Sequence, residues 1–166
     1  MKREKFLWPL TQGHHGALVG ARNVRDRLSK LGEENGEGLL SLAREVSEFF
    51  NLDLAEHFRA EEEELMKVFE AHVGPNDPGL LRIKKDHEVL RALSAVPGQK
   101  ELLLFADTLM AHVRYEEDVF FPRVEMTLTT EEKILETEKL LPFTPGSNHC
   151  PKPSAWVADD FRRNSH

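Results

Sequence analysis

The feature that most constrains this chain is a six-residue pattern that occurs twice. Residues 57–62 read HFRAEE and residues 112–117 read HVRYEE, so both copies follow His-x-Arg-x-Glu-Glu. Neither copy contains Gly or Pro, and both lie in segments rich in helix-forming residues. Residues four apart on an α-helix share a face, with their Cβ atoms about 5 to 6 Å apart. The pattern therefore places an imidazole beside a carboxylate on two helices, and such a pair can hold a metal ion.

The composition is that of a globular domain with an acidic surface. The chain has 166 residues, of which 40% are hydrophobic and 31% charged, enough for one domain with a sizeable core. Its net charge of −7 argues against a nucleic-acid partner, because phosphate binding needs a basic face. The single cysteine, Cys150, excludes an internal disulfide and any zinc site built on two thiolates of one chain.

Two further patterns bear on location. No apolar run approaches the roughly 20 residues that a membrane span requires. The first ten residues, MKREKFLWPL, lack the apolar core of a signal peptide. We therefore expect a cytoplasmic protein that does not bind membranes.

Hydrophobic periodicity predicts four long helices, at about residues 9–31, 38–72, 78–96 and 99–126. Apolar residues recur in them at alternating spacings of three and four, which is the inward stripe of a bundle helix. Asp77 before Pro78 is a typical start signal for the third helix. Fairly short loops between four helices favour an all-α fold, an antiparallel up-down-up-down bundle. In the fourth helix the predicted inward residues are Leu102, Phe105, Leu109, His112, Glu116, Val119 and Phe120.

The end of the chain is predicted to differ from the bundle. Pro122 interrupts helical hydrogen bonding, so we expect the last turn of the fourth helix to be kinked or broken. Residues 129–132 read TTEE, a capping box that opens a short fifth helix to residue 141. The bundle is therefore expected over residues 1–141. Residues 142–166 carry four prolines and no helical period, which predicts an irregular tail.

Two groups of residues in this tail have separate expectations. Trp156, Val157 and Phe161 are expected to fasten the tail to the bundle surface. His149 is adjacent to Cys150, but an irregular tail is a poor place for a preorganised site, so we expect none there.

A second repeat concerns two single histidines, His14 and His87. Each has apolar residues seven and four positions before it, and small or apolar residues three and seven positions after it. These neighbours are Leu7, Leu10, Ala17 and Ala21 for His14, and Leu80, Ile83, Leu90 and Ser94 for His87. Each helix pair thus contributes one single inward histidine, followed by one His-x-x-x-Glu.

The neighbouring histidine, His15, is an alternative to His14. His14 follows the apolar stripe, whereas His15 shares its face with Arg22, so we expect His14 to point inward. One residue is only about 100° of helix rotation. Helix distortion around the glycines at positions 13, 16 and 20 would bring His15 inward instead.

Six residues are therefore candidate metal ligands: His14, His57, Glu61, His87, His112 and Glu116. Ionised carboxylates in a dry interior cost several kcal/mol each, and a divalent cation offsets that cost. Six nitrogen and oxygen ligands exceed the four of a tetrahedral zinc. They suit two metal ions that share bridging carboxylates, and the donor types fit iron or manganese.

At these residues the sequence resembles the hemerythrin-like, HHE cation-binding family. The resemblance covers about residues 7–124. It rests on QGHH at 12–15, HFRAEE at 57–62, DHE at 86–88, HVRYEE at 112–117 and FFP at 120–122. The family fold is a four-helix bundle around a di-iron centre. The resemblance implies that Glu61 and Glu116 bridge two iron ions, or another divalent pair, with the four histidines as terminal ligands.

The sequence departs from the oxygen-carrying hemerythrins at three positions. Those proteins have a histidine four positions before His87, where this chain has Ile83. Their second carboxylate is an Asp one residue further along, where this chain offers Glu116 or Glu117. The acidic residue before the first histidine is Gly13 here. One histidine fewer leaves a more open site, so reversible oxygen carriage does not follow from the resemblance.

Three functions are consistent with these patterns. The resemblance and the lack of an added catalytic motif favour a module that binds or senses oxygen, nitric oxide or iron. The open coordination position at Ile83 fits instead a di-iron oxidoreductase that consumes peroxide or nitric oxide. The third function is a structural bundle that metal stabilises.

The second glutamate of each copy, Glu62 or Glu117, is expected to face a neighbouring helix rather than the metal. Arg59 and Arg114 lie three residues earlier, within reach of ion pairs along the same helix. The alternative is a set of solvated charges on an outer face.

Overall fold

The computed structural model describes residues 3–31, 35–96, 98–147 and 154–157. Every regular element in these ranges is a helix, which confirms the all-helical prediction. No helix within them is long and apolar enough to cross a membrane. His149, Cys150 and Phe161 lie outside the described residues.

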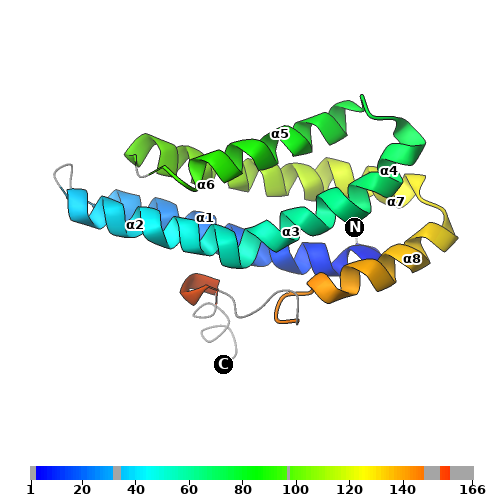
Figure 1. The fold of residues 1–166 in the computed structure, drawn as a ribbon, viewed down its shortest axis with the longest axis horizontal. Coiled ribbons are helices and arrows are strands. Elements are labelled where there is room, and N and C mark those ends of the chain that lie inside the picture. The colour runs from blue at the N-terminus through cyan, green and yellow to red at the C-terminus, as the bar shows by residue number, and fades with distance from the viewer. Residues whose placement is uncertain (1–2, 32–34, 97, 148–153, 158–166) are drawn as a thin grey trace.

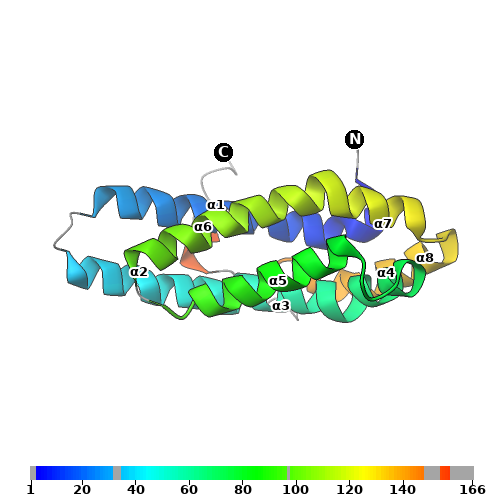
Figure 2. The ribbon, with the colours of Figure 1, turned by 90° about the horizontal axis from the view of Figure 1, so that it is seen from above.

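The described residues form four long helical segments that lie side by side (Figures 1 and 2). The first consists of the 3₁₀ turn η1 (Lys5–Leu7) and α1 (Trp8–Lys30). The second consists of α2 (Gly36–Phe49), the π-helical turn η2 (Phe50–Leu54), α3 (Ala55–Ala60), the π-helical turn η3 (Glu61–Leu65) and α4 (Met66–Val73). The third is α5 (Pro78–Leu93), and the fourth consists of α6 (Gln99–Tyr115), the π-helical turn η4 (Glu116–Phe120) and α7 (Phe121–Thr127). Helix α1 packs against α6 and α2, and α5 packs against α6.

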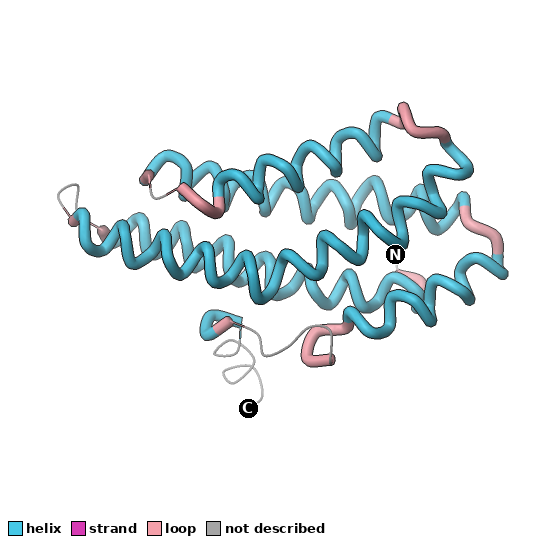
Figure 3. Tube along the Cα trace, viewed as in Figure 1, coloured by secondary structure: helices cyan, strands magenta, loops and turns pink. Residues whose placement is uncertain are grey.

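The helix starts follow the predicted signals. The Asp77 side chain accepts hydrogen bonds from the backbone N–H groups of Gly79 and Leu80, with Pro78 in the first turn of α5. Thr129 and Glu132 form both bonds of the capping box that opens α8 (Thr130–Leu140). Helix α8 is followed by the 3₁₀ turn η5 (Leu141–Phe143), and it packs against η1 and η3. Figure 3 shows that loops are confined to the connections between these helices and to the N-terminal and C-terminal regions.

The fourth segment does not end at Pro122. Helix α7 carries Pro122 in its first turn and continues to Thr127. A proline is tolerated there, because its missing N–H is not needed at the start of a helix. The departure from α-helical bonding comes earlier, in the π-helical turn η4. The predicted kink or break at Pro122 is therefore replaced by a π-helical turn just before it.

The same turn corrects the prediction for Val119, which is 42% exposed rather than inward. A π-helical turn holds more residues than an α-helical turn. The inward stripe therefore moves on by one position after Glu116. It continues with Phe120 and Phe121, both of which are fully buried.

The hydrophobic core is divided into two clusters. On α1, Leu10 belongs to one cluster and Ala17 to the other, with His14 between them. On α5, Ile83 and Leu90 are divided in the same way by His87. The chain thus places its buried histidines at the boundary between two apolar clusters.

The short described part of the tail docks on the bundle. Val157 is buried in the cluster that contains Ala17. The Trp156 indole Nε1 donates a hydrogen bond to Glu45 at 3.0 Å. The backbone N–H of Ser154 donates to the Asp53 carboxylate at 3.1 Å. The predicted fastening by Trp156 and Val157 is confirmed.

Candidate metal centre

All six predicted ligands come together in the interior between the four segments. They are His14 on α1, His57 on α3, Glu61 at the start of η3, His87 on α5, His112 on α6 and Glu116 at the start of η4. Their exposed fractions lie between 0% and 5%. The inward positions predicted from apolar spacing therefore bring these six side chains together at the same height along the four helical segments.

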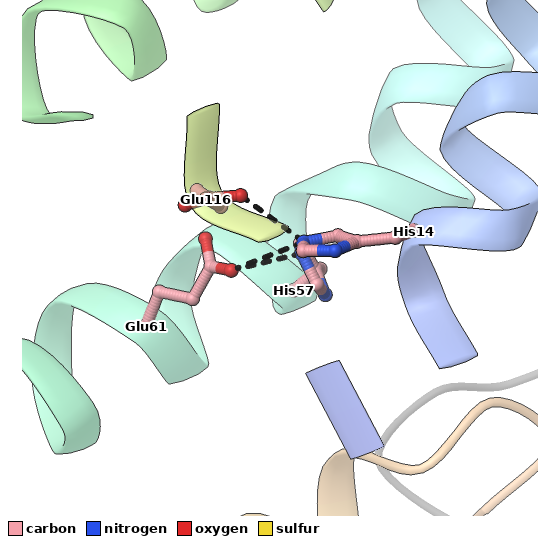
Figure 4. A group of neighbouring side chains, drawn as sticks. All are labelled: His14, His57, Glu61 and Glu116. Carbon is pink, nitrogen blue, oxygen red and sulfur yellow. Dashed lines mark ion pairs between the residues drawn. The ribbon is translucent and has the colours of Figure 1, made fainter. Parts of the chain in front are cut away.

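The first group, which we call site A, contains His14, His57, Glu61 and Glu116 (Figure 4). Nε2 of His14 lies 3.0 Å from Oε2 of Glu116 and 3.7 Å from Oε1 of Glu61. Nε2 of His57 lies 3.0 Å from Oε1 of Glu61. Both imidazoles thus direct their far nitrogen towards the carboxylates.

The second group, site B, contains His87, His112 and the same two glutamates. Nε2 of His87 lies 3.2 Å from Oε2 of Glu61, and Nε2 of His112 lies 3.2 Å from Oε2 of Glu116. The two Nε2 atoms are themselves 3.2 Å apart. Within each group the candidate ligand atoms lie within 4.8 Å of one another.

The two sites share their carboxylates. Glu61 presents Oε1 to the histidines of site A and Oε2 to His87 of site B. Glu116 lies beside His14 of site A and His112 of site B. One carboxylate between two groups of imidazoles is the arrangement of a bridging ligand in a two-metal centre.

The buried polar atoms at the centre lack hydrogen bonds. Nε2 of His14, Nε2 of His57 and all four carboxylate oxygens of Glu61 and Glu116 have no hydrogen-bond partner among the described residues. Their contacts are close enough for ion pairs, but their geometry is not that of hydrogen bonds. Each buried unsatisfied group costs about 1–3 kcal/mol. Cations between these atoms would remove that cost, so the residues present fit a pair of metal ions.

The outer nitrogens of three histidines face carboxylates. Nδ1 of His14 lies 2.7 Å from Oε1 of Glu117, and Nδ1 of His87 lies 2.6 Å from Oε1 of Glu62. Nδ1 of His112 lies 3.5 Å from Oδ2 of Asp86, too far for a hydrogen bond of ordinary strength. A carboxylate on Nδ1 fixes the ring and leaves Nε2 free to bind a metal.

These contacts correct the expectation for the two arginines. Arg59 pairs with Glu56 and Glu63 rather than with Glu62. Arg114 is exposed, and Glu117 is held instead by Arg3. Spacing along one helix suggested local pairs, whereas the carboxylates of Glu62 and Glu117 bond to side chains from other segments.

The electrostatics of the metal-free protein shift the pKa values of Glu61, His14 and His87. Burial raises the pKa of Glu61, but the charge of His57 and the close contacts of its carboxylate with His14, His57 and His87 lower this pKa well below its usual value. Burial lowers the pKa of His87, but its ion pair with Glu61 and its hydrogen bond to Glu62 outweigh burial and raise this pKa to about 9. Burial also opposes the charged form of His14, whose pKa is nevertheless raised well above its usual value by Glu116, Glu117 and Glu61. The charged forms of His14 and His87 therefore balance the negative charge of Glu61 when no metal ion is present.

The structure places His14 in the cluster and His15 on the exposed side of α1. Gly13 has a packing role. A Cβ atom at this position would lie 2.6 Å from Nδ1 of His57, closer than real Cβ contacts allow. The glycine before His14 therefore lets the His57 ring approach α1.

Two features of the site were not predicted from the sequence. π-Helical turns begin at both Glu61 and Glu116, and such turns often occur at functional sites. Aromatic rings also cover the histidines: Phe58 stacks on His87 with ring centroids 3.9 Å apart, and Phe121 stacks on His14 at 5.3 Å. The repeated Glu-Glu pairs coincide with these two π-helical turns, but two adjacent glutamates do not by themselves predict such a turn.

Comparison with known proteins adds one match. Residues 9–124 match the family model described as the hemerythrin HHE cation binding domain. No curated protein and no solved structure matches the chain. The matched range contains all six residues of sites A and B.

Proposed function

The chain belongs to the hemerythrin HHE cation-binding family, and from that premise we propose that it binds two metal ions, one at site A and one at site B. In this proposal Glu61 and Glu116 bridge the ions, His14 and His57 complete site A, and His87 and His112 complete site B. The observation that carries the proposal is that the two groups share two buried carboxylates, which have no hydrogen-bond partner in the part of the chain that the structure describes.

The fold in this proposal is an antiparallel up-down-up-down four-helix bundle. The path of the chain in Figure 2 supports it, because the colours run out along α1, back along α2 to α4, out along α5 and back along α6 and α7. Each site then takes its ligands from helices that are adjacent in space.

We propose iron as the native metal. Each site offers two imidazole nitrogens and oxygens of two carboxylates, a donor set that suits iron or manganese better than copper(I). Other divalent ions can occupy the same ligands after purification. With four protein ligands, an ion that prefers six ligands keeps open positions. Iron in such a site supplies a redox-active centre that binds a small molecule.

The surroundings of the site favour a small, uncharged ligand such as oxygen or nitric oxide. Phe58 and Phe121 cover the histidines, and both rings are buried. Ile83 is completely buried at the position where oxygen-carrying hemerythrins have a further histidine. Apolar side chains around open coordination positions disfavour charged ligands, since these would lose their hydration. We propose that the protein binds or senses such a gas, or iron itself.

Metal analysis and spectroscopy test this function. Protein purified in air is expected to contain about two iron ions per chain, as the two groups of ligands imply. The reduced protein is expected to develop optical bands with oxygen or nitric oxide that reverse when the gas is removed. A folded protein without metal, with the Glu61→Ala/Glu116→Ala variant equally stable, would contradict the proposal.

Two other functions have their own signatures. The open position beside Ile83 favours an oxidoreductase that consumes peroxide or nitric oxide, and turnover well above that of free iron would identify it. A purely structural metal would raise the melting temperature without any optical response to gases.

The cytoplasmic location and the absence of nucleic-acid partners also remain predictions. The net charge of −7 supports the absence of nucleic-acid partners.

A further inference from the structure

The second glutamate of each His-x-Arg-x-Glu-Glu copy bonds to a histidine on a different helical segment. Glu62, in the copy on the second segment, reaches His87 on the third. Glu117, in the copy on the fourth segment, reaches His14 on the first. The two contacts are equivalent by position in the repeat, and they have nearly the same length, 2.6 and 2.7 Å.

The contacts cross between the two sites. The copy that contains Glu62 gives His57 to site A, whereas Glu62 itself holds a histidine of site B. The copy that contains Glu117 gives His112 to site B, whereas Glu117 holds a histidine of site A. Each copy therefore serves both sites.

Each of the two carboxylates is fixed by an arginine on its outer side. Glu62 accepts two hydrogen bonds from Arg91, at 2.9 and 3.0 Å. Glu117 accepts one from Arg3 at 2.8 Å through Oε2, and its Oε1 also accepts a bond from Thr11 at 3.1 Å. An arginine, a carboxylate and an imidazole thus follow one another from the surface to each site.

The two arginines differ in origin. Arg91 is on α5, one turn after His87, and its side chain is 41% exposed. Arg3 lies before the first helix, and its side chain is only 13% exposed. Arg3 also bonds to the carboxylate of Glu125 and lies over the ring of Phe121. The support for His14 therefore comes from the N-terminal segment, whereas the support for His87 comes from its own helix.

We propose that Glu62 and Glu117 are positioning residues, which orient His87 and His14 for metal binding and couple sites A and B by this crossed arrangement. The proposal rests on the two-metal function proposed above. A charged acceptor on Nδ1 keeps that nitrogen protonated, directs Nε2 to the metal and increases its basicity. The repeated Glu-Glu pair then has two roles, with the first residue at the metals and the second behind a histidine.

The test uses the full chain and iron(II), without oxygen, in competition with a chelator. Glu62→Gln and Glu117→Gln are expected to keep two ions per chain at saturation and to weaken one of them by about 10- to 100-fold. Glu63→Gln and Asp118→Asn are matched controls one residue further along. Both side chains are exposed, and Glu63 pairs with Arg59 at 3.6 Å. The controls are expected to bind iron as the wild type does.

The crossed arrangement predicts which site each variant loses. Crystals are equilibrated with the concentration of iron(II) that half-saturates the wild type, and bound iron is located by anomalous scattering. We expect iron to be lost from site B in Glu62→Gln and from site A in Glu117→Gln. Loss from the opposite site, or equal loss from both, would overturn the crossed arrangement. Affinities equal to those of the control variants would overturn the positioning role.

A readout without metal separates this inference from the proposed function. In the metal-free wild type, nitrogen NMR is expected to show His87 and His14 protonated on Nδ1 and hydrogen-bonded. Only the His87 signal should change in Glu62→Gln, and only the His14 signal in Glu117→Gln. If these selective NMR changes are observed but the wild type binds no metal, the proposed function is wrong, whereas the orientation of His87 by Glu62 and of His14 by Glu117 is confirmed. A general loss of melting temperature in both metal-free Gln variants, with no selective change, would show a structural role and overturn the inference.

Discussion

Gly13 lies directly before His14 on α1, and its backbone approaches the ring of His57. A Cβ atom there would lie 2.6 Å from Nδ1 and 3.0 Å from Cε1 of that ring. The ring is rigid and buried, so a methyl group at position 13 has to displace it. Gly13 costs about 1 kcal/mol in helix propensity relative to Ala. Its presence in α1 is explained by the close approach of the His57 ring, which leaves no room for a Cβ atom.

The Gly13→Ala variant tests this contact. Overpacking typically costs about 1–3 kcal/mol, which outweighs the gain of about 1 kcal/mol in helix propensity. We expect a lower free energy of unfolding and at least tenfold weaker metal binding at site A, measured by denaturant titration and chelator competition. The matched control is Gly36→Ala, where a Cβ would meet nothing within 4 Å, so stability should stay the same or rise. Metal binding by Gly13→Ala equal to that of the wild type would contradict the account.

At the scale of single elements, the start of α5 sets the position of His87. Asp77 caps this helix through the N–H groups of Gly79 and Leu80 and pairs with Arg123 of α7 at 2.7 Å. One carboxylate thus fixes both the start of α5 and its contact with the fourth segment.

Substitution of Asp77 separates these two roles. Asp77→Ala loses the cap and the ion pair, and we expect a loss of about 0.5–2 kcal/mol in the free energy of unfolding. Asp77→Asn keeps a capping side chain and should lose less. Arg123 is the largest cause that lowers the pKa of Asp77 in the folded protein. The advantage of the wild type over Asp77→Asn should therefore be full above about pH 4, the unfolded value, and disappear as pH falls through the lower folded pKa. A difference that does not change between pH 7 and pH 3 would argue against the ion pair.

Local sequence patterns predicted the helical elements but not their distortions. Apolar spacing located the four segments, and short capping signals located the starts of α5 and α8, because these signals are local. The π-helical turns η3 and η4 have no local signal in the sequence. The prediction that Val119 points inward was wrong because it assumed regular α-helical spacing through η4. The hydrogen-bond partners of Glu62 and Glu117 could not be predicted either, since spacing along one helix does not specify which side chains on another helix lie nearby. The candidate ligands were predictable, because a repeated pattern fell on the inward stripes.

At the scale of the whole molecule, a layer of charged and polar groups separates two apolar clusters. The unsatisfied atoms of this layer weaken the metal-free protein, since a buried polar group without a partner costs free energy. In the proposed two-metal centre, bound ions would couple the two halves of the core through shared ligands.

Removal of metal tests this coupling. A ligand that binds only the folded state at 100 times its dissociation constant stabilises it by about 2.7 kcal/mol. We expect the metal-loaded protein to melt several degrees above the protein treated with a chelator. The Glu61→Gln/Glu116→Gln variant should melt at the same temperature with and without metal. Equal melting temperatures for the loaded and metal-free wild type would show that the core does not depend on metal.

The most direct test of the two-metal centre is anomalous diffraction from crystals of the iron-loaded protein. We expect two peaks in the anomalous difference map, one beside His14 and His57 and one beside His87 and His112. Glu61 and Glu116 should lie between both peaks. A single peak, or iron bound away from these side chains, would contradict the account.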